Sequence, residues 1–203
     1  MEATAFNSKN LSFDANTKRV SYEGKPLRIK TGEIILSEGG ILPYINPTTK
    51  QPFYEYPNGK DDYRRYSISI PLEGQLKKTI TKIDSFMKTI PTDGKHEYHK
   101  LIREGKPDSK YNQKDKITVK FPSDFITKKI LTMVYKDTGG KIKEAPVDKF
   151  SDLEEMITYG TTVNMVIRIK KVWETETKYG VRIECEQLLI TDRPKEKIEC
   201  AFV

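Results

Sequence analysis

Two long runs of alternating residues in the C-terminal third constrain the fold more than any other feature. The runs cover residues 163–173 and 181–191, and a polar link ending in Gly180 joins them. Period-two alternation with many β-branched residues predicts two antiparallel strands connected as a hairpin. One phase of each strand is apolar, and these positions are Val163, Met165, Ile167 and Ile169 on the first strand and Val181, Ile183, Cys185 and Leu189 on the second. Each strand therefore has one face suited to a core.

The opposite phase of the hairpin is polar and places several charges on the solvent side. Its positions are Asn164, Arg168 and Lys170 on the first strand and Arg182, Glu184 and Glu186 on the second. Each run also breaks phase once, at Val172 and at Leu188, as a β-bulge or a strongly coiled strand requires. Long coiled strands with one wet face are typical of a small closed sheet. We therefore expect an α+β fold built on an OB-like antiparallel β-barrel of five or more strands, with inserted helices.

Shorter patterns place further elements around this hairpin. Strands are expected at 27–29, 34–36, 66–72, 117–121 and 130–135, and helices near 75–90, 97–104 and 152–158. The helix at 75–90 is the clearest, because its apolar residues recur at three- and four-residue spacing and form one stripe. We expect residues 1–25 to form an N-terminal arm, residues 26–191 a single OB-like domain and residues 192–203 a C-terminal tail.

The charge of the chain indicates the class of partner. The chain has 36 Lys and Arg against 29 Asp and Glu, a formal net charge of +7 and a sequence pI of about 9.1. The excess lies in the middle, where residues 61–130 contain 16 Lys and Arg but only 10 Asp and Glu. Lysine outnumbers arginine 28 to 8, which favours contacts with phosphates over bidentate reading of base edges. Nucleic acid or another polyanion is therefore the first partner to consider.

The lengths of the apolar runs and the number of cysteines indicate the cellular location of the protein. No apolar run approaches the length of a membrane span, and the first residues lack the basic and apolar segments of a secretion signal. Cys185 and Cys200 are the only thiols, too few for a disulfide framework. We expect an intracellular protein with no membrane partner.

No motif predicts catalysis or a metal site. His96 and His99 are the only histidines, and no close pair of further ligands accompanies them. The pairs Gly39-Gly40 and Gly139-Gly140 lack the pattern of a phosphate-binding loop and indicate turns. Since local sequence suggests no nucleophile with its base, we expect no enzymatic activity, no metal and no cofactor.

Cationic and aromatic residues stand beside one another at several places. Single-strand binders combine such residues, because cations neutralise phosphates and ring faces stack on any base. The candidates for nucleic-acid contact are Tyr63, Arg64, Arg65, Tyr66, Lys110, Tyr111, Lys114, Lys116, Arg168, Lys170, Trp173, Tyr179 and Arg182. Two alternatives stay open. The proline-rich aromatic stretch 43–66 also fits a ring cluster packed on the body, and Trp173, the only tryptophan, also fits a core position.

The order of elements resembles that of the OB-fold single-stranded DNA-binding proteins of nucleocytoplasmic large DNA viruses, the group that includes African swine fever virus. The similar segments are 66–72 before the amphipathic helix, 100–103, 117–121, 130–141, 150–155 and the closing hairpin at 163–191. The resemblance implies an OB barrel that binds single-stranded DNA during viral replication. It also implies a location at replication sites in the host cytoplasm or in the virion.

Charge, rings and resemblance together predict sequence-independent binding of single-stranded DNA during replication, recombination or repair. RNA is a second ligand to consider, and copies of the chain are expected to associate along the strand. The alternative is a structural or protein-interaction module, such as a basic virion component whose loops contact an acidic partner.

Overall fold

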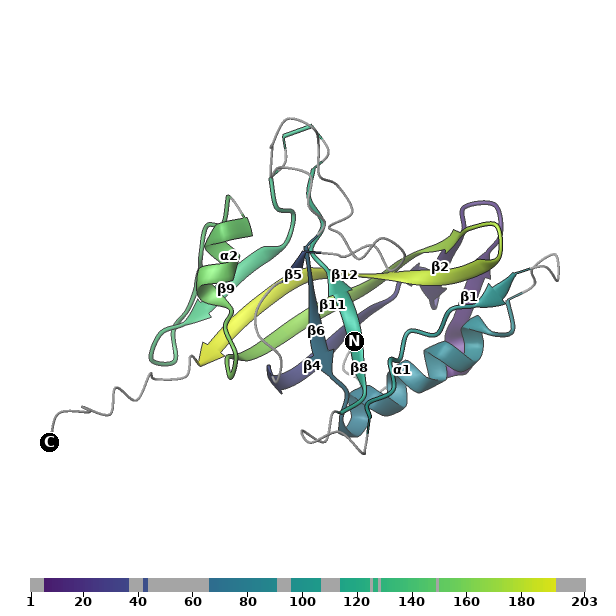
Figure 1. Cartoon of the computed structure of the whole chain (residues 1–203), viewed down its shortest axis with the longest axis horizontal. Helices are drawn as coiled ribbons and strands as arrows, with labels where there is room; N and C mark the ends of the chain where they lie inside the picture. Colours follow the sequence, from purple (N-terminus) through teal and green to yellow (C-terminus); the bar gives the residue numbers. More distant parts are fainter. Residues whose placement is uncertain are drawn as a thin grey trace, which may run out of the picture.

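The computed structural model describes residues 6–36, 42–43, 66–90, 96–106, 114–124, 126–127, 129–148 and 150–192. They form an α+β arrangement around one mixed sheet (Figure 1). The strands are β1 (Leu11–Asp14), β2 (Arg19–Tyr22), β3 (Lys25–Pro26), β4 (Arg28–Ile35), β5 (Leu42–Pro43), β6 (Tyr66–Pro71), β7 (Glu97–Tyr98), β8 (Lys116–Lys120), β9 (Met133–Asp137), β10 (Ile142–Glu144), β11 (Thr162–Glu174) and β12 (Lys178–Asp192). The helices are α1 (Gly74–Met87) and α2 (Phe150–Met156), with a short 3-10 turn, η2 (Ser8–Asn10), before β1.

The predicted hairpin is present as β11 and β12, which pair antiparallel and run through the middle of the molecule in Figure 1. Its predicted apolar positions are buried on β11, and Val181, Ile183 and Cys185 are buried on β12. The register shifts between Ile169 and Val172, which confirms the phase break there. On β12 the pairing moves from Cys185 to Gln187 across one step of β11, so Glu186 is an extra residue. The prediction for Leu189 is therefore wrong, because this bulge turns Leu188 and Ile190 into the core instead.

Each long strand collects several partners along its length. β11 pairs antiparallel with β4 and, at Lys171, with β2. β12 pairs in parallel with β7, β8 and β9 at successive positions, and β8 continues antiparallel to β6. The expectation of a purely antiparallel sheet is therefore wrong.

Helix α1 supplies the apolar stripe predicted from spacing. Leu76, Ile80, Ile83 and Met87 are buried, and the hydroxyl of Tyr179 on β12 donates a hydrogen bond of 3.0 Å to the carbonyl of Met87. Figure 1 shows α1 beside the β1–β2 end of the long hairpin, with α2 and β9 at the opposite end. Within the described chain, neither helix is long and apolar enough to cross a membrane.

The described part of the expected N-terminal arm is folded onto the body. β1 and β2 form a hairpin whose Leu11 and Val20 are buried, and Phe6 stacks on Tyr22 with ring centroids 5.5 Å apart. The Asp14 carboxylate closes the turn by accepting from the Thr17 hydroxyl and from two backbone N–H groups, which lowers the pKa of Asp14. The sequence predicts a loosely held arm or one edge strand here, because each of the two strands is only four residues long and buries one side chain.

The expected helix at 97–104 is not formed. Residues 97–98 pair with β12 as β7, and the buried Asp84 carboxylate of α1 holds the following segment. Asp84 accepts from the Tyr98 hydroxyl at 2.5 Å and from the backbone N–H groups of Leu101 and Ile102 at 2.8 and 3.2 Å. Because Asp84 accepts from these backbone N–H groups, they are not available for the hydrogen bonds of a helix, and the helical spacing of the apolar residues does not produce one.

Two further predictions need adjustment. The strands expected at 27–29 and 34–36 are one strand, β4, interrupted by a bulge at Thr31 and Gly32, where Gly32 has a φ of 76°. The strand expected at 130–135 begins at Met133, while Ile130 makes only an isolated bridge to Ser123.

Candidate nucleic-acid interface

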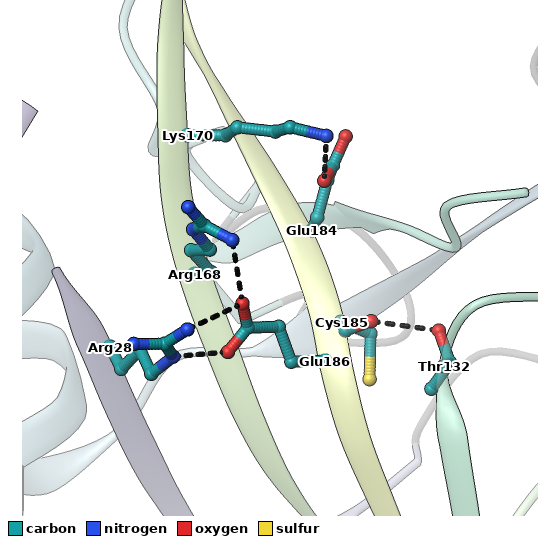
Figure 2. A network of polar contacts seen from close by, with 7 residues as sticks. All are labelled: Arg28, Thr132, Arg168, Lys170, Glu184, Cys185 and Glu186. Carbon is teal, nitrogen blue, oxygen red and sulfur yellow. Dashed lines mark hydrogen bonds and ion pairs between the residues drawn. The ribbon is translucent and has the colours of Figure 1, made fainter. Parts of the chain in front are cut away.

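The polar face of the sheet brings charges from β4, β11 and β12 together. Arg168 of β11 is the register partner of Arg28 on β4 and of Glu184 on β12. Residues paired across strands point to the same side of a sheet, so these side chains share one surface. We call the resulting group the charged cluster, and it consists of Arg28, Arg168, Lys170, Arg182, Glu184 and Glu186. Figure 2 shows these side chains with the exception of Arg182.

Glu186 is shared between two arginines from different strands. Its Oε1 accepts from Arg168 Nη1 at 3.0 Å and from Arg28 Nη2 at 3.2 Å, while its Oε2 accepts from Arg28 Nε. Partial burial alone would raise the pKa of Glu186, but the hydrogen bonds from Arg28 and Arg168 outweigh it and lower that pKa. The same contact raises the pKa of Arg28. Glu186 and Arg28 therefore stay charged at neutral pH. The bulge at Glu186 gives its side chain this central place.

Glu184 is the buried member of the cluster. Its side chain is only 4% exposed, although the sequence pattern placed it on the solvent side. Lys170 Nζ lies 3.0 Å from one oxygen and Arg182 Nε lies 2.7 Å from the other. The Arg182 Nε–H is not directed at that oxygen, so within the described structure neither atom gains a hydrogen bond from the contact. Glu184 therefore anchors two cations mainly through charge.

The carboxylate side chains of the charged cluster are less exposed than its cationic side chains. The two carboxylate side chains are 4% and 21% exposed, whereas the four cationic side chains are between 29% and 46% exposed. Four cations against two carboxylates also leave a formal excess of two positive charges. The surface presented to solvent by the charged cluster is therefore mainly cationic.

A pocket of about 410 Å³ adjoins the cluster at the α2 end of the hairpin. Its floor is formed by β11 and β12, and Tyr135 of β9 and Ile142 of β10 form one side. Lys30 and Gly32 of β4 form the other side. We call this the face pocket. The bulge at Gly32 shapes it, because Thr31 Oγ1 instead of a β4 carbonyl accepts the Met165 N–H, at 3.0 Å.

Trp173 lies at the other end of the cluster, near the turn of the hairpin. It is half-buried and is the register partner of Gly180. A Cβ at Gly180 would lie 2.5 Å from the indole, so the ring covers the glycine closely. The His99 ring is tilted against it, with centroids 5.7 Å apart. The alternative of a fully buried core tryptophan is therefore not what the structure shows.

Trp173, the charged cluster and the face pocket lie in line along the hairpin. From Gly180, the partner of Trp173, to Leu189 in the face pocket, β12 advances nine residues. At about 3.3 Å per residue this is roughly 30 Å. One surface therefore carries a ring at each end and cations between them.

Apart from Tyr66 and Tyr179, the predicted contact residues fall into three groups. Arg168, Lys170, Arg182 and Trp173 lie on this surface. Lys114 and Lys116 lie at the start of β8, where Lys114 is paired with Glu73 before α1. Tyr63, Arg64, Arg65, Lys110 and Tyr111 lie outside the described residues, so their predicted role stays a prediction.

Tyr66 and Tyr179 are core residues, which corrects the expectation that they stack on bases. Tyr66 is 8% exposed and stacks on Phe150 with centroids 3.8 Å apart. Tyr179 is 3% exposed, donates to Met87 and packs against Tyr98 at 5.2 Å. Burial raises the pKa of Tyr179. Each tyrosine stands at the same phase of its strand as buried apolar residues, so the alternation in the sequence already indicated an inward position.

Three residues of the surface were missed from sequence. Arg28 and Lys30 lie on β4, more than 130 positions before their partners on β11, and only the strand register brings them together. Tyr135 lies at the end of the strand predicted at 130–135, for which no outward face was assigned. Its alternation with the buried Val134 is the only sequence signal for its outward position.

The described residues contain no group of three His, Cys, Asp or Glu side chains that could hold a metal ion. His99 instead contacts Trp173. Cys185 is fully buried, and burial raises the pKa of its thiol.

No protein-family model matches this sequence, and no curated protein matches it either. Among solved structures, the chain is similar to the single-stranded DNA-binding protein from bacteriophage Enc34 in complex with ssDNA, at 16% identity and a TM-score of 0.47 over 93% of this chain and 98% of that one. It is also similar to gp2.5, a single-stranded DNA-binding protein encoded by bacteriophage T7, at 12% identity and a TM-score of 0.42 over 85% of this chain and 95% of that one. Identities and scores this low leave the function to be inferred from the geometry of the chain itself.

Proposed function

We propose that this chain binds single-stranded DNA without sequence preference across the surface formed by Trp173, the charged cluster and the face pocket. The observation that carries the proposal is the layering of charge, with four cations that are more exposed than the two carboxylates beneath them, on a face that has an aromatic side chain at each end. Cations in such a groove neutralise phosphates, and each base stacked on a ring contributes about 1 to 3 kcal/mol. The proposal includes no chemical step.

The two carboxylates of the charged cluster support this function by positioning the cations. Arg28 and Arg168 come from two strands and share the Glu186 carboxylate, which fixes where the guanidinium groups lie. A cation held in place loses less side-chain entropy when it meets a phosphate. The partner is extended, because the surface runs for roughly 30 Å along the hairpin. A stacked strand at about 3.4 Å per nucleotide would fit at most about nine nucleotides there.

The salt dependence of binding tests the proposal. Affinity for fluorescent oligo-dT is measured by anisotropy across a range of salt concentrations. The logarithm of the affinity should fall linearly with the logarithm of salt, by about 0.7 per phosphate neutralised. The double variant Arg28→Gln/Lys170→Gln should reduce the slope, and each carboxylate keeps its second cation, Arg168 or Arg182.

A matched control removes the same charge elsewhere. Lys78 and Lys88 are exposed lysines on or just after α1, away from the charged cluster. Lys78→Gln/Lys88→Gln should leave the slope close to that of the wild type. No binding of oligo-dT at low salt would contradict the function, and an equal loss of slope in both double variants would contradict the site.

A second function has one observation in its favour. Every cation of the charged cluster already has a carboxylate partner, as expected for a structural or protein-interaction module with a rigid polar face. Such a module would leave Trp173 fluorescence unchanged on adding oligonucleotide, whereas stacking would quench it. The same titration therefore separates the two functions.

We also propose that the sheet closes as an OB-like barrel of β4, β11, β12, β8 and β6. Support comes from the strand order, in which β4 pairs with β11 at one side, β6 follows β8 at the other, and β4 approaches β6. In a closed barrel the amides of β4 that face β6 exchange their hydrogens as slowly as those that face β11. Fast exchange along that edge would show an open sheet.

Origin and location are further parts of the proposal. The charge of +7 and the sequence resemblance support a viral replication protein that acts inside the cell, at cytoplasmic replication sites or in the virion. RNA binding and association between copies along the strand are further possibilities that the same anisotropy titration measures, with oligo-U as ligand and with longer oligo-dT. Immunofluorescence against labelled nascent DNA tests the location.

A further inference from the structure

The face pocket has the chemistry of a site for one nucleobase, beyond a general surface for stacking. On its floor, Val166 is the register partner of Gln187, and Asn164 is the partner of Leu189. The two amides therefore occupy one diagonal of a four-residue square, and the two apolar side chains occupy the other. Diagonal neighbours of this kind lie about 7 to 8 Å apart. A flat ring can rest on the apolar pair while both amides reach its edge.

The amides of this square have unused hydrogen-bonding capacity. Among the described residues, neither the Asn164 nor the Gln187 side chain has a hydrogen-bond partner, although both are half-buried. Each amide offers two donors and one acceptor group. Half-buried polar groups without protein partners at the floor of a pocket are suited to a ligand whose edge carries both donors and acceptors. A nucleobase has such an edge.

The sides of the face pocket complete the fit to a nucleotide. Tyr135 supplies a ring, Ile142 is 61% exposed and widens the apolar contact, and Lys30 supplies positive charge beside the charged cluster. A volume of about 410 Å³ lies in the range of about 300 to 1,000 Å³ found for small-ligand sites. A Cβ at Gly32 would meet no atom within 4 Å, so the β4 side of the pocket is open there.

We propose that the face pocket takes one base of the bound strand and hydrogen-bonds its edge through Asn164 and Gln187. This inference rests on the proposed function and refines it. Most of the strand is held through phosphate and ring contacts that tolerate any base, so binding as a whole needs no particular sequence. At one position the base adds affinity through the hydrogen bonds that its edge makes.

An abasic scan tests the inference. A short oligonucleotide that binds in a 1:1 complex is made in versions that each lack one base, and the affinity of each is measured at fixed salt. For the wild type, removing the base at one position should lower the affinity about threefold to tenfold more than removing a base at any other position. This is the range expected for one or two lost hydrogen bonds. Replacing that base by each of the other three should also change the affinity.

The amide-free variant Asn164→Leu/Gln187→Met keeps side-chain size and removes the hydrogen bonds. In this variant, no abasic position should lower the affinity more than the others, while the slope of log affinity against log salt stays at the wild-type value. The single variants Asn164→Leu and Gln187→Met serve if the double variant unfolds, and each should remove part of the effect. Circular dichroism reports folding for all of them.

The outcomes separate the pocket from the surface. Strong binding with equal cost at every abasic position would overturn the base pocket and leave the proposed function standing. A special position that persists unchanged in the folded amide-free variant would also overturn it. Failure of every oligonucleotide to bind at low salt would overturn the proposed function itself.

Discussion

Glu186 accepts hydrogen bonds from two arginines on a surface that we propose to bind phosphates. Its carboxylate competes with phosphate for the same guanidinium groups, so it both positions Arg28 and Arg168 and weakens their pull on DNA. This balance has a pH dependence. Since the pKa of Glu186 is lowered in the folded chain, its ionisation contributes stability above the unfolded pKa, and that contribution is lost as pH falls through the lowered value.

Glu186→Gln should strengthen DNA binding and weaken the acid dependence of stability. The variant releases both arginines toward phosphate, so affinity for oligo-dT at low salt should rise several-fold. The urea midpoint of the wild type should fall on acidification from about pH 5 to pH 3, and the variant should show a smaller fall. Glu104→Gln, which removes an exposed carboxylate paired with Lys100, is the control and should change neither result. Weaker binding by Glu186→Gln would show that positioning outweighs competition.

Trp173 is the side chain most directly tested by spectroscopy, because it is the only tryptophan. Oligo-dT should quench its fluorescence if a base stacks on the indole. Trp173→Ala should lose about 1 to 3 kcal/mol of binding free energy, while Trp173→Phe retains a ring and should lose less. Equal affinities for wild type and both variants would remove Trp173 from the binding surface.

At the scale of elements, Asp84 of α1 determines the path of the segment that carries His99. This one buried carboxylate accepts three hydrogen bonds from residues 98–102, including the short bond from Tyr98. Burial and the bond to Asp84 raise the pKa of Tyr98, so its hydroxyl remains the donor. The ordered segment then brings His99 against Trp173.

Asp84→Asn should destabilise the fold and disturb the tryptophan. An amide presents two donors where three donors already point, and hydrogen bonds to charged groups contribute about 1.5 to 3 kcal/mol each. We therefore expect the free energy of unfolding in urea to fall by at least about 1.5 kcal/mol, with a shift in Trp173 emission. Asp137→Asn, at the exposed turn before Gly140, should change the unfolding free energy by less than about 0.5 kcal/mol. An unchanged Trp173 emission in folded Asp84→Asn would show that Asp84 does not position His99.

The elements predicted correctly are those whose pattern is long. The hairpin and α1 repeat their period over many residues, so one face is fixed before any tertiary contact forms. The failures have tertiary causes. Residues 97–104 have helical spacing, but Asp84 and β12 take their donors, and Leu189 changes face because Glu186 is an extra residue in β12.

Only part of the candidate surface could be predicted from the sequence, because some of its residues reach it through strand register. Arg168, Lys170 and Arg182 follow from the alternation of the hairpin itself, whereas the sequence left Trp173 open between core and surface. Arg28 and Lys30 reach the surface through the register of β4, and that register includes a bulge at Gly32 which no local pattern specifies. Tyr66 and Tyr179 show the converse, because a ring beside a cation in sequence can still point inward on a strand.

At the scale of the whole molecule, the long hairpin serves as core and surface at once. Its inward side chains, with those of α1, form one apolar cluster, and its outward side chains form the charged cluster. The two roles meet between neighbouring residues, since Ile167 is fully buried and the adjacent Arg168 contacts Glu186. Changes on the inner face should therefore alter stability, and changes on the outer face should alter binding.

Ile167→Ala and Ile35→Ala test this division, because they delete the same atoms at sites of opposite exposure. Ile167 is 0% exposed, so Ile167→Ala should lower the free energy of unfolding by about 2 to 5 kcal/mol. Ile35 is 64% exposed, so Ile35→Ala should lower it by less than about 0.5 kcal/mol. Urea denaturation measures both. At temperatures where both variants are folded, each should bind oligo-dT with the wild-type salt slope, because neither change touches a cation of the charged cluster. If folded Ile167→Ala lost the salt slope, the positions of the cations would depend on core packing as well as on the two carboxylates.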